Sequence, residues 1–193
     1  MSRYGKGAAA VGLLAAAVVI AAPSAQAQTG GSVAPGGGTT PPATTTGVPG
    51  VATLNADGSA TPPSDAPKRV RKAINAANKI RYKPYVYGGG HSSFKAKGYD
   101  CSGAVSYVLH AAGLLRTPLP SGPLGSKWGK PGLGKWITVY GNAGHAYAVI
   151  AGLRWDTSAV GESLTSGTGP RWRSTPRDAT GYNVRFALTP YGL

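Results

Sequence analysis

Cys101 is the single cysteine of this 193-residue chain, and its position predicts a reactive thiol. Asp100 stands at the N-cap of a helix expected to begin at Cys101, so the thiol lies in a first turn, where free N–H groups and the helix dipole stabilise a thiolate. The dipole contributes only about 0.3–1 kcal/mol, less than one pKa unit, so a stronger partner is required. A buried inert thiol and an intermolecular disulfide are the alternatives for a lone cysteine.

The three histidines of the chain differ in how well each could serve as the base for this thiol. His110 is nine residues beyond Cys101 on the same expected helix, which at about 100° per residue places it on roughly the opposite face. His91 follows a glycine run in an expected loop, which would orient it poorly for proton transfer, so it is kept as a minor alternative for the base or as a substrate contact. His145 opens an expected strand, which would hold the imidazole rigidly. We therefore predict His145 as the base that takes the thiol proton and later returns it to a leaving amine.

A third polar residue is expected beside the imidazole. The segment 154–158 lies across a tight turn from the His145 strand, and antiparallel pairing brings Asp156 back toward the level of His145. A carboxylate there would fix the ring tautomer and stabilise the imidazolium. A surface position at the strand end is the alternative for Asp156. The predicted catalytic set is Cys101, His145 and Asp156.

The elements that would position these residues follow from hydrophobic spacing. A first helix is expected over 67–81, with Ser64 or Asp65 as its cap. The helix that begins at Cys101 has an apolar stripe and should stop at Gly113. Strands are expected over 136–140, 145–151, 154–158 and 182–188. The sequence therefore predicts an α+β domain in which the nucleophile helix packs on a small antiparallel sheet.

The first third of the chain is not expected to belong to this domain. Residues 1–27 combine basic residues, an apolar run of fifteen residues and a small-residue triplet, the pattern of a cleaved signal peptide. A transmembrane anchor is the alternative, but the run is short of the roughly 20 residues that a span needs. Residues 28–66 are rich in Gly, Pro and Thr and are predicted to form a disordered linker. One catalytic domain is then expected over 67–193.

The charge balance bears on partners. The formal net charge is +14, and removal of the signal leaves 18 basic against 6 acidic residues, a net charge of +12. For an exported protein, this charge favours attraction to anionic wall polymers, although it could merely keep the protein soluble. Nucleic acid is not expected as a partner, because the basic residues are scattered and no nucleic-acid-binding signature accompanies them. No cofactor, metal or stable membrane anchor is expected, and the protein is predicted to be a monomer.

Three motifs in order resemble the NlpC-type family of bacterial cell-wall cysteine peptidases. They are Pro-Tyr-Val-Tyr-Gly-Gly at 84–89, Asp-Cys-Ser-Gly at 100–103 and Gly-His at 144–145, and the resemblance spans about 68–158. It implies a papain-like core, a location outside the cell or in the wall, and cleavage of the stem peptides of peptidoglycan. The third polar residue of the family is usually a histidine, where this chain has Asp156. The segment 169–178 lies outside the motif, and its Arg and Trp residues could grip an acidic peptide or cover the sheet edge.

The same resemblance implies roles for individual residues. Cys101 matches the nucleophile and His145 the base, and the backbone N–H of Cys101 would contribute to the oxyanion hole. Tyr87, with Tyr85 as the second choice, matches an upstream tyrosine near the site. Asp100 and Ser102 match positions that line the substrate groove. Tyr87, Asp100 and Ser102 are thus the expected substrate-binding residues.

Other functions would use the same residues differently. A catalytically inactive wall-binding module of the same fold would keep the groove and the charge without a reactive thiol. An amidase or an acyltransferase would use the same Cys–His pair. A zinc peptidase would use His91, Asp100 and His145, although the chain lacks His-Glu-x-x-His or another compact ligand pair.

Overall fold

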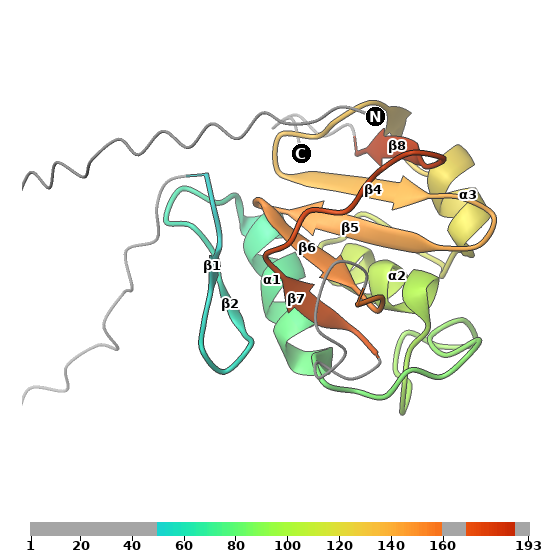
Figure 1. Cartoon of the computed structure of the whole chain (residues 1–193), viewed down its shortest axis with the longest axis horizontal. Helices are drawn as coiled ribbons and strands as arrows, with labels where there is room; N and C mark the ends of the chain where they lie inside the picture. Colours follow the sequence, from blue (N-terminus) through green and yellow to red (C-terminus); the bar gives the residue numbers. More distant parts are fainter. Residues whose placement is uncertain (1–49, 160–168, 188–193) are drawn as a thin grey trace, which may run out of the picture. The chain divides into compact units, whose positions relative to one another are not determined.

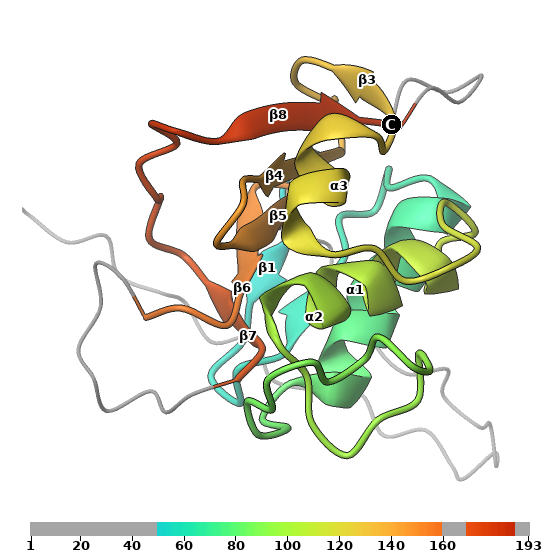
Figure 2. The same cartoon turned by 90° about the vertical axis from the view of Figure 1, so that its right-hand side faces the viewer.

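Two helices cover one face of an antiparallel sheet in the computed structural model, which describes residues 50–159 and 169–187 (Figures 1 and 2). The helices are α1 (Lys68–Ile80) and α2 (Cys101–Ala111), which lie side by side. Farther along the chain, the short helix α3 (Ser121–Ser126) packs against strands of the same sheet. The mixed α+β class predicted from the sequence is therefore confirmed. The predicted signal peptide and residues 28–49 of the predicted linker lie outside the described residues.

The sheet has six strands in the order β3-β8-β4-β5-β6-β7, and all neighbouring pairs are antiparallel. The strands are β3 (Lys130–Pro131), β4 (Ile137–Gly141), β5 (Ala146–Ile150), β6 (Leu153–Asp156), β7 (Arg171–Arg173) and β8 (Asn183–Phe186). The expected strands over 136–140, 145–151, 154–158 and 182–188 correspond to β4, β5, β6 and β8, with shifts of one or two residues at their ends. Segment 169–178 contributes β7, an edge strand.

The apolar stripes of the two helices form the core. Val105, Val108 and Leu109 of α2 are each no more than 1% exposed, as expected for the side of α2 that faces the sheet. The indole N–H of Trp155 in β6 donates to the carbonyl of Ala104 in α2 at 3.2 Å. Because Trp155 is fully buried, this bond ties the helix that begins at Cys101 to the strand that ends at Asp156.

The structured part of the chain begins earlier than the sequence predicts. Within the predicted linker, β1 (Thr53–Leu54) and β2 (Ala60–Thr61) form a hairpin. The side chain of Asn78 in α1 donates to the carbonyl of Ala60 at 2.8 Å and accepts its N–H at 2.9 Å. Small buried alanines and an amide from α1 therefore fix a segment whose composition suggested disorder, and the predicted domain boundary at residue 67 is too late.

The start of α1 also differs from expectation in its cap. Pro67 occupies the N-cap, and no side chain caps the helix. Asp65, one of the two predicted caps, instead accepts the N–H of Gly50 at 2.9 Å. The bounds of α1 agree with the predicted helix over 67–81, but its cap residue was predicted wrongly.

A crossover segment, residues 174–182, connects β7 at the sheet edge to β8 on the other side of β4. It runs across the face of the sheet opposite α1 and α2 (Figure 1). Arg154 in the sheet donates to the carbonyl of Pro176 in this segment at 3.3 Å. Both faces of the sheet are thus covered in its central part. Within the described residues, no helix is long and apolar enough to span a membrane.

Candidate active site

Cys101 is positioned by the capped start of α2. The carboxylate of Asp100, in extended conformation, accepts the N–H of Gly103 at 2.7 Å, as the sequence predicts for an N-cap. The glycine run packs directly on this first turn: a Cβ on Gly103 would come within 2.0 Å of the carbonyl oxygen of Gly89. The backbone of the loop therefore approaches the nucleophile helix more closely than a side chain at Gly103 would allow.

His145 is held at the mouth of the β4–β5 hairpin. The side-chain oxygen of Asn142 accepts the N–H groups of Gly144 at 3.0 Å and of His145 at 2.9 Å, which fixes the turn that leads into β5. The imidazole is mostly buried, with 19% of the side chain exposed. A ring fixed in this way can present one nitrogen in a constant direction.

The imidazole connects a carboxylate and the thiol. Its Nε2–H donates to Oδ1 of Asp156 at 2.8 Å, and the Asp156 carboxylate is fully buried. The other ring nitrogen, Nδ1, is then available to the Cys101 thiol, which interacts with the His145 side chain closely enough for each group to shift the pKa of the other. Cys101, His145 and Asp156, from three different elements, are thus brought together in the order expected of a nucleophile, a base and an orienting group.

These contacts favour the ion-paired form of the site. Burial would raise the pKa of the Cys101 thiol, but hydrogen bonds from the His145 side chain and the backbone of Ala146 outweigh it, so this pKa lies below its ordinary value. Burial would likewise lower the pKa of His145, but hydrogen bonds to Asp156 and Cys101 raise it to about 9. A lowered thiol pKa and a raised imidazole pKa both favour the thiolate–imidazolium pair over the neutral pair.

Two arginines surround the buried carboxylate and were missed by sequence reasoning. Arg177, from the crossover segment, places Nη1 3.2 Å from Oδ2 of Asp156, and Nε of Arg154 lies 3.5 Å from the same oxygen. The Arg177 guanidinium also lies 5.6 Å from the ring centroids of both Tyr147 and Tyr182. The two guanidinium groups thus lie where they can compensate a negative charge on the buried carboxylate that faces His145.

The predicted substrate-binding residues have different settings. Tyr87 is 91% exposed, whereas Tyr85 is close enough to the thiol that the charges of Cys101 and Asp100, after burial, raise the pKa of its hydroxyl. This electrostatic coupling and the lower exposure favour Tyr85, the second choice of the sequence analysis, as the tyrosine beside the site.

Asp100 and Ser102 are buried rather than open to a groove, with 7% and 4% exposure. His91 Nε2 lies 3.1 Å from Oδ1 of Asp100 and 3.1 Å from Oγ of Ser102, and Oδ2 of Asp100 accepts the N–H of Gly88 at 3.1 Å. Their polar atoms thus fasten the glycine loop to α2. Of these residues, only His91 directly follows the glycine run in the sequence, and the Asp-Cys-Ser triplet lies about ten residues farther on.

His110 lies apart from Cys101, and the three residues of the zinc alternative do not converge on one point. His110 is exposed and stacks on Phe94 at 3.8 Å, away from Cys101. The zinc alternative needs His91, Asp100 and His145 to converge, but the residues described by the structure contain no group of three His, Cys, Asp or Glu side chains able to hold a metal ion. His145 is engaged with Asp156 instead.

Comparisons with known proteins give matches only at the level of structure. No family model and no curated protein matches the sequence. The hypothetical invasion protein Rv1477 of Mycobacterium tuberculosis is 20% identical, with a TM-score of 0.42, over 62% of this chain and 64% of that chain. An NlpC/P60 family protein from Bacillus cereus ATCC 10987 is 20% identical, with a TM-score of 0.46, over 62% of this chain and 40% of that chain. The chain therefore spans less than two thirds of the length of each protein, and the chemistry of the site has to be inferred from its own side chains.

Proposed function

We propose that this chain is a secreted cysteine peptidase that hydrolyses amide bonds in the stem peptides of peptidoglycan. The observation that carries the proposal is that the His145 imidazole, which donates to the buried Asp156 carboxylate at 2.8 Å, also interacts with the Cys101 thiol and lowers its pKa. A helix that begins at the thiol and packs on an antiparallel sheet that carries the base is also the arrangement of a papain-like core. The substrate class rests on the resemblance of the 84–89, 100–103 and 144–145 motifs to NlpC-type wall peptidases and on the predicted signal peptide.

The geometry supports a two-step hydrolysis. The Cys101 thiolate attacks the carbonyl carbon of the amide, and the negative charge that develops on the carbonyl oxygen faces the first turn of α2, whose N–H groups have no partners within the helix. The His145 imidazolium then gives its proton to the leaving amine as the C–N bond breaks. Water, deprotonated by the neutral imidazole, hydrolyses the thioester to a carboxylic acid and restores the thiolate.

Asp156 has an orienting role in both steps. Its bond to Nε2 directs Nδ1 toward the sulfur, and its charge stabilises the imidazolium. The arginines beside Asp156 act through the carboxylate and are positioning residues. Because Asp100 and Ser102 are buried, selection among peptides is expected to depend more on exposed groups near the thiol, Tyr85 among them.

The test is digestion of defined muropeptides with the products read by mass spectrometry. The purified chain should release fragments that are one water heavier in total than the intact peptide, and Cys101→Ala and His145→Gln should each abolish them. His110→Gln is the matched control, because this exposed histidine lies away from the thiol, and it should keep wild-type activity. Cleavage by the Cys101→Ala variant would contradict the proposal.

A separate measurement distinguishes the enzyme from an inactive wall-binding module. A thiolate held by an imidazolium should react with iodoacetamide at pH 6 to 7 much faster than free cysteine, whose pKa is about 8.5. Alkylation of Cys101 no faster than that of free cysteine, together with binding to intact peptidoglycan, would favour the module.

A further inference from the structure

A row of basic side chains runs along α1 beside α2. Arg69, Lys72 and Lys79 share one side of the helix, because they are three and seven residues apart, and all three are exposed. The row spans about 15 Å, at 1.5 Å per residue. Within the residues described, none of the three forms an ion pair. Their charges are therefore available to a ligand.

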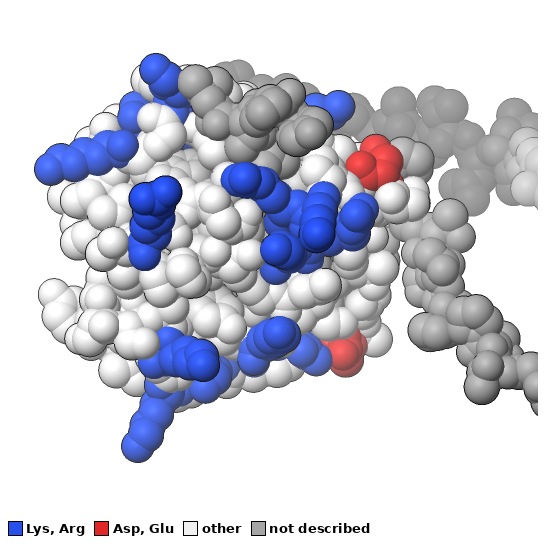
Figure 3. All heavy atoms as spheres, turned by 180° about the vertical axis from the view of Figure 1, so that it is seen from behind, with Lys and Arg blue, Asp and Glu red and all other residues white. Residues whose placement is uncertain are grey.

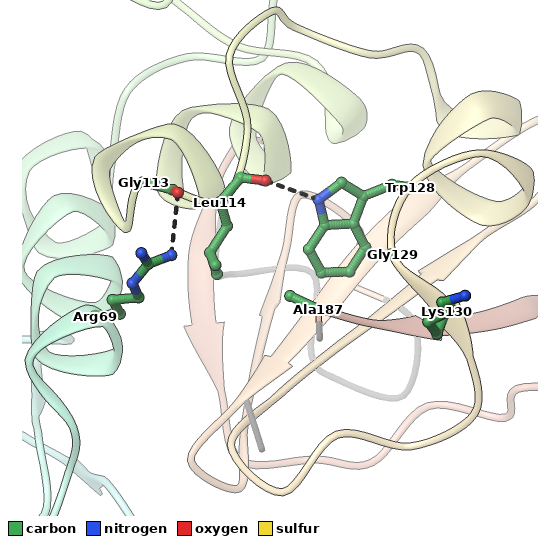
Figure 4. A pocket seen from close by; sticks show the side chains of 7 residues that line it. All are labelled: Arg69, Gly113, Leu114, Trp128, Gly129, Lys130 and Ala187. Carbon is green, nitrogen blue, oxygen red and sulfur yellow. Dashed lines mark hydrogen bonds between the residues drawn. The ribbon is translucent and has the colours of Figure 1, made fainter. Parts of the chain in front are cut away.

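The first part of the row borders a hollow of about 380 Å³ at the C-terminal end of α2 (Figure 4). Arg69 stands on one side of it and Lys130 on the other, with Leu114 and Trp128 between them. Arg69 donates one N–H to the carbonyl of Gly113 at 3.2 Å. A guanidinium has five N–H donors, so this bond holds the side chain at the hollow and leaves others for an anion.

The second part of the row borders another hollow, of about 320 Å³, between α1 and α2. Lys72 and Lys79 line it from α1 together with Asn75, and Tyr107 lines it from α2. Residues later in α1 lie opposite residues earlier in α2, so the two hollows lie along one boundary between the helices. We call this boundary, with its two hollows, the α1–α2 groove. Its lysines are separated by the amide of Asn75 and the phenol of Tyr107. This pattern suits a polymer in which anionic groups alternate with units that carry hydroxyl groups.

Charge of one sign dominates this side of the molecule. Among the residues that the structure describes, no acidic one lines either hollow. Figure 3 shows the molecule from behind the view of Figure 1, which is the side on which α1 and α2 lie. Lys and Arg side chains are spread over this side, whereas the acidic groups lie toward one edge. An extended polyanion would therefore meet a favourable potential along the groove and little repulsion.

We propose that the α1–α2 groove binds a linear polymer of polyol or sugar units joined by phosphodiesters. Arg and Lys are the residues that pair with phosphate oxygens, and the spacing of the row lets two or three phosphates of one chain be paired at once. A bilayer surface fits less well, because the apolar residues of α1, Val70 and Ile74 among them, are fully buried and none is left to insert into lipid. Single-stranded nucleic acid fits less well because, among the described residues, Trp128 of the first hollow is buried and Tyr107 is the one ring that lines the second, which leaves little surface for base stacking.

The groove is distinct from the candidate active site. At 1.5 Å per residue, Tyr107 lies about 9 Å and Ala111, the last residue of α2, about 15 Å along the helix from Cys101. The thiol faces His145 in the sheet, whereas the groove faces α1. A polymer in the groove would hold the protein on a surface without covering the thiol, and this inference does not depend on the proposed peptidase activity.

The probe for a binding experiment is deacylated poly(glycerol phosphate), titrated against the full chain by isothermal calorimetry at several salt concentrations. The test variant combines Arg69→Gln, Lys72→Gln and Lys79→Gln. Three exposed pairs of about 0.5 kcal/mol each predict binding about tenfold weaker, and the slope of log affinity against log salt should fall in magnitude by up to about 2.

The matched control replaces three exposed lysines outside both hollows, Lys95, Lys97 and Lys127, with glutamine. It makes the same change in net charge and should keep nearly wild-type affinity. Both variants should keep the wild-type melting temperature and rate of Cys101 alkylation, which separates failure of this inference from failure of the peptidase proposal.

Three results would overturn the inference. Equal weakening in the test and control variants would mean that net charge alone attracts the polymer. Equal affinity for polyglutamate of matched charge would remove the preference for phosphodiesters. Tighter binding of single-stranded DNA with the same number of phosphates would assign the groove to nucleic acid.

Discussion

Replacement of Asp156 by asparagine removes the charge that faces His145 while it keeps the size of the side chain. The rise in the pKa of His145 from 6.5 to about 9 corresponds to about 3 kcal/mol in favour of the imidazolium, and the bond to Asp156 is the largest contribution that raises it. Loss of about half of this free energy would lower the pKa of His145 by roughly one unit. Loss of between half and all of it would lower kcat/KM by about tenfold to 150-fold.

The sign of the pH dependence follows from the same contacts. The thiolate–imidazolium pair exists between the lowered pKa of Cys101 and the pKa of His145, so cleavage by the wild type should fall as pH rises through about 9. In Asp156→Asn, the imidazolium loses its proton at lower pH and the thiolate forms at higher pH, so the active range narrows from both sides.

The assay is the rate of Cys101 alkylation and of muropeptide cleavage between pH 5 and 10, with the His145 ring titrated by NMR. Asp178→Asn is the matched control, because Asp178 is an exposed carboxylate on the crossover segment whose side chain bonds to Thr180. It should reproduce the wild-type profiles. If a folded Asp156→Asn variant also reproduces them, the carboxylate does not govern the imidazole and the reasoning is refuted.

Two substitutions test how the site is supported. Gly103→Ala should lower the free energy of unfolding by about 1–3 kcal/mol in urea titrations, because its methyl group would meet the Gly89 carbonyl. The control is Gly122→Ala in α3, where nothing lies within 4 Å of the added carbon, and it should be neutral or stabilising. Equal effects of the two substitutions would disprove the close approach at Gly103. Trp155→Phe should cost about 1–2 kcal/mol through the lost bond to α2 and should slow Cys101 alkylation, whereas an unchanged alkylation rate would show that this bond does not position the thiol.

The parts of the structure that sequence predicted well depend on local patterns. The stripe of α2 and the N-cap at Asp100 are encoded within a few residues, and α2 begins at Cys101 as expected. Antiparallel register then carried the prediction to Asp156: β5 and β6 pair Ala148 with Trp155, so Asp156 lies one step nearer to His145. The contact between Asp156 and His145 could therefore be expected before any coordinates.

The parts that sequence did not predict depend on contacts between distant segments. Arg177 reaches Asp156 only because the crossover segment passes over the sheet, and no periodicity encodes that path. The hairpin within residues 50–66 has few large apolar residues and is fixed by Asn78 of α1, so its composition alone suggested a linker. Tyr85 and Tyr87 differ in exposure through the turn of their loop, which spacing could not distinguish.

The crossover segment also has a consequence for biosynthesis. A nascent chain that has emerged as far as residue 159 already contains Cys101, His145 and Asp156, but it lacks Arg177 and strand β8, which pairs with both β3 and β4. Cys101 is thus synthesised dozens of residues before Arg177, whose guanidinium compensates the charge of Asp156. We therefore expect the Cys101 thiol to become reactive only after residues 177–186 have been synthesised, so that an incomplete chain has little thiol reactivity.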